Sequence, residues 1–151
     1  MNDSKKLWET KALVDNEEYE SAINILDSDD WDLSPKEDRF RLVLIAHSLL
    51  HLGKYENAIE FADVVLQKKD TSEFASQIRY LSLVKLKKYD EAFEEIFHFL
   101  SFNEANLYKV TLEELLTDIQ AGYINDEDNI KKIQNLAQRN NVNFIIDDGL
   151  N

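Results

Sequence analysis

The 151-residue sequence contains no cysteine, one proline and three glycines. Without cysteine the chain has no disulfide framework, no thiol nucleophile and no thiolate metal site. Glycine and proline supply the many tight turns of β-sandwiches, so their scarcity favours long helices with short connections. The length is typical of a single domain with its own hydrophobic core.

Basic residues and long apolar runs are also scarce. Seventeen Lys and Arg stand against 30 Asp and Glu, which gives a net charge of −13. Nucleic-acid contacts need clustered Lys and Arg, and anionic membrane surfaces repel a negative chain, so we expect neither partner. The first ten residues have no apolar segment of a secretory signal, and the run at residues 42–46 is too short to cross a bilayer. We therefore expect a cytoplasmic protein.

The acidic residues are concentrated near the start of the chain. Residues 1–38 contain 12 Asp and Glu against 4 Lys, a net charge of −8. A local concentration of this kind raises the association rate of a basic partner, although acidic surfaces also serve solubility. The predicted steering patch consists of Asp27, Asp29, Asp30, Asp32, Glu37 and Asp38.

One pattern of residues occurs twice, 34 positions apart. Tyr55 and Ala58 in the first copy correspond to Tyr89 and Ala92 in the second. Apolar residues that precede each tyrosine recur in steps of three, which keeps their side chains on one helical face. A weaker copy begins at Tyr19, 36 residues before Tyr55. The chain therefore reads as a series of similar helical units.

Helix start and stop signals divide the chain in the same way. Residues 34–37 form a predicted capping box with proline in the first turn, opening a helix that ends near Leu52, and residues 70–73 offer a similar start. A further helix is expected from Asn103 to Gly122, and a last one after Asp126. Residues 141–151 form a tail that docks through its apolar positions 144–146 or is frayed.

This pattern resembles the tetratricopeptide repeat, with units at about 4–28, 36–69, 71–100 and a degenerate 103–140. The resemblance implies an all-α, right-handed array of antiparallel helical hairpins in one domain, residues 1–151. Glu17 and Lys87 stand where the family has its turn glycine. In the fourth unit Ile124 and Glu127 stand where tyrosine and alanine are usual.

In that family the first helix of each hairpin lines a concave groove that binds a protein partner. The resemblance places in this groove Leu7, Lys11, Val14, Phe40, Val43, His47, Leu50, His51, Phe74, Gln77, Leu81, Val84 and Lys85. Such an apolar and aromatic lining suits a docked helix or an extended peptide. For Phe40 and Phe74, packing in the core is an equal alternative. The basic clamp with which one subclass holds carboxylates is not assembled at these positions.

Other candidate sites are weaker. His47 and His51 lie four residues apart, a spacing that can bind a metal, but no third ligand is identifiable, so we expect polar groove contacts and no metal or cofactor. The acids at residues 27–32 lack the glycine and the spacing of a calcium loop. Within them Trp31 is expected to pack against the neighbouring hairpin, with a partner anchor as the alternative. His98 is expected to be structural.

No nucleophile–base pair, phosphate loop or metalloprotease motif is present in the sequence, so we expect no enzymatic activity. Two functions fit a small acidic repeat protein of this kind. The first is an inhibitor, such as an immunity protein that neutralises a toxin, with a basic nuclease as one candidate. The alternative is a secretion or assembly chaperone or adaptor that holds its partner in the groove. An enzyme accessory, a scaffold and a homodimer are further alternatives.

Overall fold

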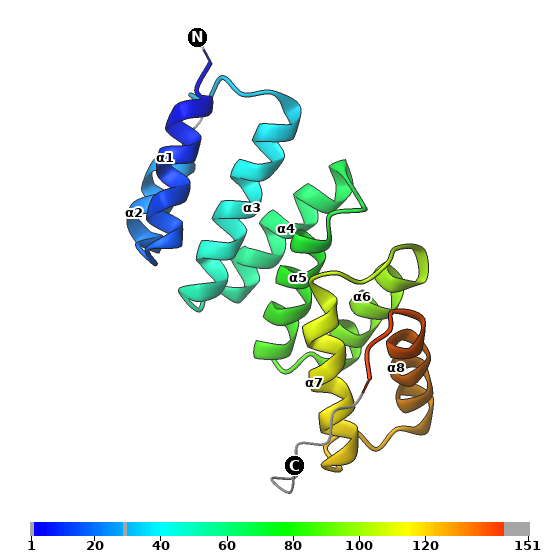
Figure 1. The fold of residues 1–151 in the computed structure, drawn as a ribbon. Helices are drawn as coiled ribbons and strands as arrows, with labels where there is room; N and C mark the ends of the chain where they lie inside the picture. Colours follow the sequence, from blue (N-terminus) through cyan, green and yellow to red (C-terminus); the bar gives the residue numbers. More distant parts are fainter. Residues whose placement is uncertain (1, 29, 144–151) are drawn as a thin grey trace, which may run out of the picture. The chain divides into compact units, whose positions relative to one another are not determined.

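The structure, a computed structural model, describes residues 2–28 and 30–143, and these residues form helices and no strands (Figure 1). The helices are α1 (Ser4–Asp15), α2 (Tyr19–Leu26), α3 (Pro35–His51), α4 (Tyr55–Lys68), α5 (Glu73–Lys85), α6 (Tyr89–Phe102), α7 (Tyr108–Gln120) and α8 (Glu127–Arg139). The predicted all-α class is confirmed. Asp29 and the apolar tail residues Phe144, Ile145 and Ile146 lie outside the described residues.

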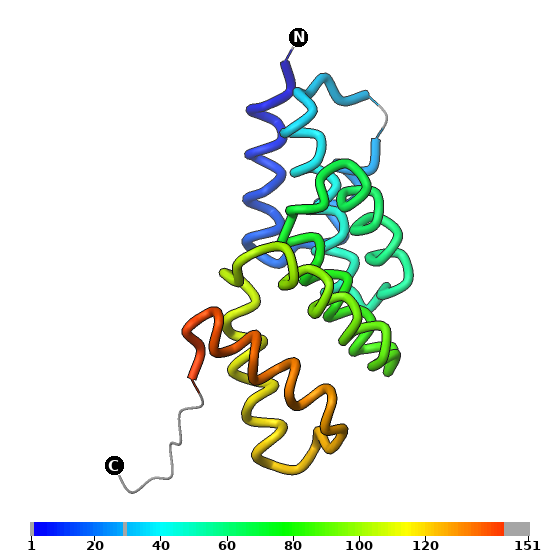
Figure 2. The backbone as a smooth tube through the Cα atoms, turned by 90° about the vertical axis from the view of Figure 1, so that its right-hand side faces the viewer, coloured from blue at the N-terminus to red at the C-terminus, as the bar shows by residue number. Residues whose placement is uncertain are grey.

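Contacts divide the chain into two compact units, Met1–Glu95 and Ile96–Asn151, which we call unit 1 and unit 2. In unit 1, α1 pairs with α2 and α3 with α4, and α4 packs in turn against α5. Among the first helices, α3 is also a neighbour of both α1 and α5. In unit 2, α7 pairs with α8, as the tube in Figure 2 shows. The assignment of all 151 residues to one domain stays a prediction.

The helix starts follow the sequence signals. Ser34 caps α3 in a reciprocal capping box with Glu37, and Pro35 occupies the first turn. Ser72 caps α5 by accepting a hydrogen bond from the backbone of Ala75, and Asp126 caps α8. These caps satisfy backbone N–H groups that have no partner inside their own helix.

One predicted helix start is wrong. Residue 103 does not open α7, which begins five residues later at Tyr108. The Asn103 side-chain amide instead donates to the carbonyl of Phe99, 3.0 Å away, and so completes the end of α6. The following Ala105 is buried, and its N–H donates to the side-chain oxygen of Asn140 at 2.8 Å. These bonds hold residues 103–107 in a non-helical connection.

Four hairpins share one turn, in which a residue with positive φ follows the first helix. Its φ is 63° at Glu17, 78° at Gly53, 62° at Lys87 and 83° at Gly122. At Gly53 the N–H donates to Leu50, and the next N–H, of Lys54, donates to Leu49. The equivalent pair of bonds occurs at the other three turns. This is the Schellman pattern, which satisfies the last carbonyls of a helix. The sequence-predicted repeat units are therefore also repeats of backbone geometry.

The small side chains of the repeat pattern lie between helices. Ala58 of α4 is fully buried and Ala92 of α6 is 2% exposed. Arg79 of α5 adds a polar connection, because its guanidinium bonds Asp63 of α4 at 2.9 Å and Glu95 of α6 at 3.0 Å. Close approach of helices thus combines with ion pairs to join successive hairpins of unit 1.

Candidate functional site

Six aromatic and imidazole side chains gather on helices α1, α2, α3 and α5 of unit 1, and we call this set the ring face. It consists of Trp8, Tyr19, Phe40, His47, His51 and Phe74. The ring centroids of Trp8 and Phe40 are 5.2 Å apart. His47 contacts three other rings, with centroid distances of 4.4 Å to His51, 5.7 Å to Phe74 and 6.0 Å to Tyr19.

Helix periodicity explains how the ring face forms. Phe40, His47 and His51 are separated by seven and four residues, so they lie on one face of α3. Phe74 follows Phe40 by 34 residues and has the same position in the next hairpin. Tyr19 opens α2, and its ring stacks on His51 with an interplanar angle of 9°. Residues from three hairpins therefore meet across α3.

The ring face is accessible to solvent. Trp8 is 55% exposed and Phe74 is 39% exposed, values that are high for large apolar side chains. His51 is exposed, and Tyr19, Phe40 and His47 are half-buried. Of the two phenylalanines for which core and groove were alternatives, Phe74 lies at the surface, whereas Phe40 packs against the core with part of its ring exposed.

His47 is the most strongly perturbed titratable group of this face. Its pKa is lowered from 6.5 to about 4, mainly by burial and also by the neighbouring His51, while the Asp15 charge opposes the shift. The imidazole is therefore neutral at neutral pH. Among the described residues no group of three or more His, Cys, Asp or Glu side chains is placed to hold a metal ion.

Three of the predicted groove residues belong to the core instead. Leu7, Val14 and Val43 are at most 6% exposed and pack inside unit 1, so their side chains do not reach a partner. Leu50 is half-buried against the same core. The first helix of a hairpin has apolar residues both on the face toward the core and on the face toward the groove. The sequence alone does not show which of these residues point toward the core.

The remaining predicted groove residues have mixed surroundings. Lys11 is half-buried and forms an ion pair of 2.7 Å with Asp15 one turn later. Gln77, Leu81 and Val84 are half-buried along α5, and Lys85 is exposed near its end. Trp8 and Tyr19 were missing from the prediction. Trp8 is a large aromatic residue on a polar side of α1, and this placement is a sequence signal for an exposed contact. The sequence pattern marks Tyr19 only as a residue of the repeat.

Two carboxylates of the acidic patch already have hydrogen-bonding partners. Glu37 accepts hydrogen bonds from Ser4 and Ser34, and the bond from Ser4 holds the pKa of the Glu37 carboxyl below its usual value. Asp38 pairs with Arg41 at 3.0 Å. Asp27, Asp30 and Asp32 are exposed. Between them Trp31 is half-buried against the core of unit 1, with the Lys6 Nζ 4.4 Å from its ring centroid.

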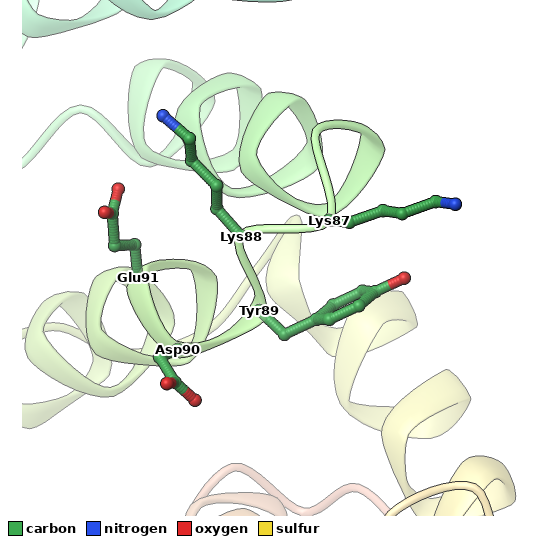
Figure 3. Close-up of a pocket in the computed structure, with 5 residues that line it drawn as sticks. All are labelled: Lys87, Lys88, Tyr89, Asp90 and Glu91. Atoms are coloured by element: carbon green, nitrogen blue, oxygen red, sulfur yellow. The ribbon is translucent and has the colours of Figure 1, made fainter.

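Two shallow hollows occur at equivalent turns of the repeat. One is lined by residues 87–91 and the other by residues 53–57 with Leu86. In Figure 3, Lys87 and Tyr89 extend to one side of the turn, and Lys88 and Glu91 to the other. Because these side chains diverge, the hollow at residues 87–91 follows from the shape of the turn.

Comparison with known families identifies one match within the chain. Residues 32–99 match the model of a family described as anaphase-promoting complex, cyclosome, subunit 3 (ANAPC3), which is a tetratricopeptide-type repeat family. These residues are tetratricopeptide-like. The matched residues cover the second and third hairpins, α3 to α6, where the sequence pattern and the Schellman turns also coincide. The predicted resemblance is confirmed.

Tetratricopeptide-type families are generally interaction scaffolds without catalysis, so the tetratricopeptide-like fold indicates a protein-binding role. Searches of curated proteins and of solved structures gave no match. None of the helices that the structure describes has the length and hydropathy needed to span a membrane.

Proposed function

We propose that this protein is a non-enzymatic cytoplasmic binding module that holds one partner protein on its ring face and inhibits it. The observation that carries this proposal is the exposure of Trp8 and Phe74 beside half-buried rings on adjacent helices. Partly exposed aromatic side chains on a rigid support are typical binding hot spots. A toxin neutralised by an immunity protein of this kind is the partner we favour.

Charge supports an inhibitor of a basic protein. The net charge is −13, and the first 38 residues account for −8 of it. Opposite charge on the partner would raise the association rate, and the apolar contacts on the ring face would limit dissociation. The chaperone or adaptor alternative is favoured by exposed rings outside the ring face, at Phe102 and Tyr123, which are 76% and 81% exposed.

The test is capture of the partner followed by reconstitution with the purified partner. Trp8→Ser and Phe74→Ser should weaken binding by about tenfold or more, because each removes an exposed aromatic contact. The matched control is Tyr123→Ser, an exposed ring of unit 2. If both ring-face variants bind the partner normally and the control variant loses binding, the ring face is not the binding site.

A second measurement separates the two functions. An inhibitor should abolish the activity or toxicity of the purified partner at one-to-one stoichiometry. A chaperone should leave the activity of the folded partner intact and raise its soluble yield. Size-exclusion chromatography of the free protein distinguishes both from a homodimer, in which a second copy of the chain covers the ring face.

A further inference from the structure

One end of the ring face has a composition that the apolar part lacks. There the phenol of Tyr19 stacks on the imidazole of His51 at a centroid distance of 5.0 Å, and His47 lies 4.4 Å from His51. His51 is exposed, so part of this stack is accessible to solvent. The face of an aromatic ring such as that of Tyr19 attracts a cation placed over it.

Carboxylates border the same end. Asp15 ends α1 and Glu17 lies in the turn before α2, and both side chains are exposed. The Asp15 charge acts on His47, and the Glu17 charge adds to burial in raising the pKa of Tyr19. Lys11 is paired with Asp15 and balances one of the two charges. From α5 the ring stack meets Phe74, which is uncharged.

We propose that this stack of Tyr19, His51 and His47, with Asp15 and Glu17 at its edge, receives a lysine or arginine side chain of the partner protein. The inference rests on the proposed function and names the chemistry of the contact. The rings supply a cation–π surface, and the carboxylates supply opposite charge at close range. A basic segment of the partner is therefore bound here directly.

The acidic segment at residues 27–38 is less suited to this contact. Its Glu37 and Asp38 carboxylates already bond Ser4, Ser34 and Arg41. Exposed acids without an adjacent ring stack act over a distance and mainly affect association. The specific recognition of a cation is thus assigned to the turn between α1 and α2.

The test uses two synthetic amphipathic helical peptides with the same apolar residues, one carrying lysines and the other glutamines at the polar positions. Binding to the full chain is measured by titration calorimetry, and the His51 and Tyr19 ring signals are followed by NMR. We expect the lysine peptide to bind about threefold to thirtyfold more tightly, the range that a cation–π contact supplies. It should also shift both ring signals.

Two charge variants locate the contact. Glu17→Lys and His51→Lys should each weaken lysine-peptide binding by about tenfold, because each places a cation in the site. Lysine can adopt the positive φ required at position 17, since Lys87 has a φ of 62° in the equivalent turn. The control is Glu94→Lys, the same charge change at an exposed position of α6, and should leave binding unchanged. Circular dichroism verifies that each variant is folded.

Acid gives an independent readout. As the pH falls from about 7 toward about 4, the His47 imidazole gains a proton and repels a cation, so lysine-peptide affinity should fall more steeply than glutamine-peptide affinity. If both peptides bind with equal affinity, and Trp8→Ser abolishes the binding of both, this inference is overturned and the proposed function still stands. Absence of binding by both peptides would also overturn it, whereas failure to hold any purified partner would remove the proposed function itself.

Discussion

The hairpin of α3 and α4 in unit 1 and the hairpin of α7 and α8 in unit 2 have the same turn but different side chains around it. Gly53 and Gly122 both have positive φ, and the same two backbone bonds close each turn. After Gly53 the second helix starts two residues later, at Tyr55. After Gly122 it starts five residues later, at Glu127. The backbone turn is thus retained where the repeat residues are not.

Unit 2 replaces the missing repeat residues with a buried polar contact. Asn140 is 8% exposed, accepts a hydrogen bond from the N–H of Ala105 and donates one to the carbonyl of Leu136, both at 2.8 Å. This amide joins the end of α8 to the connection before α7. The comparison teaches that a helical hairpin needs a left-handed turn and an apolar face. The Tyr–Ala pattern is only one of several ways to pack its two helices together.

The largest expected effect tests whether the two units are separate. Leu112 of α7 is fully buried, so Leu112→Ala should lower the free energy of unfolding by about 2–5 kcal/mol. In this variant, amide hydrogen exchange should be faster than in the parent in α7 and α8, with little change in α1 to α4. The reason is that helices packed in one unit open together. Uniform acceleration across all helices would show that the two units unfold as one.

Acid should weaken unit 1 through His47. Folding lowers the pKa of this imidazole from 6.5 to about 4, so its neutral form is favoured in the folded state. The resulting stability is complete above the unfolded pKa and is lost as the pH falls toward about 4, by up to about 3 kcal/mol. His47→Gln should flatten the pH dependence of the unfolding free energy by this amount. An unchanged dependence would mean that His47 is solvated in the folded protein.

An overpacking substitution compares equivalent positions of the two hairpins. Ala58 and Glu127 each lie five residues after the turn glycine, but Ala58 is fully buried and Glu127 is exposed. Ala58→Leu should cost about 1–3 kcal/mol because the helices have no room for the larger side chain. Glu127→Leu should cost less than about 1 kcal/mol. Thermal or urea unfolding measures both, and equal costs would refute the difference in packing.

Removal of the Asn140 amide tests the contact that is specific to unit 2. Asn140→Ala leaves the buried N–H of Ala105 without its acceptor and should cost about 1–2 kcal/mol in urea unfolding. Asn135→Ala, an exposed position on the same helix, is the matched control and should change stability by less than about 0.5 kcal/mol. If the two variants are equally stable, the amide does not hold unit 2 together.

The smallest effect concerns the turns that lack glycine. Lys87 adopts the left-handed conformation at a cost that glycine avoids, so Lys87→Gly should stabilise the protein by up to about 1 kcal/mol. The reverse change, Gly53→Ala, should destabilise it by a similar amount, since an added Cβ meets no atom within 4 Å and only the backbone resists. Shifts of the same sign for both substitutions would contradict this account.

The sequence predicted the features that depend on local signals. The capping box at Ser34, the turns at Gly53 and Gly122 and the phase of the repeat all follow from neighbouring residues. The start of α7 was missed because Asn103 and Ala105 are fixed by bonds to Phe99 and to the distant Asn140. Long-range contacts of this kind leave no periodic signal.

The candidate site was only half predictable for a related reason. His47, His51 and Phe74 were expected on an accessible face, and they lie together there. Leu7, Val14 and Val43 were expected beside them but are buried, because hydrophobicity alone does not give the direction of a side chain on a helix. Tyr19 joins the rings only through the packing of α2 against α3.

The two tryptophans, Trp8 of α1 and Trp31 between α2 and α3, make the N-terminal part of unit 1 its own optical reporter. Trp8 is 55% exposed next to Phe40, so its fluorescence should move to shorter wavelength and resist quenching by iodide when a partner covers the ring face. Trp31 is half-buried beneath Lys6, and its indole N–H has no hydrogen-bond partner among the residues that the structure describes. In Trp8→Phe the remaining emission comes from Trp31 and reports its packing against the core of unit 1. Comparison of the parent protein with Trp8→Phe therefore separates association at the ring face from loosening of the packing around Trp31, without a dye.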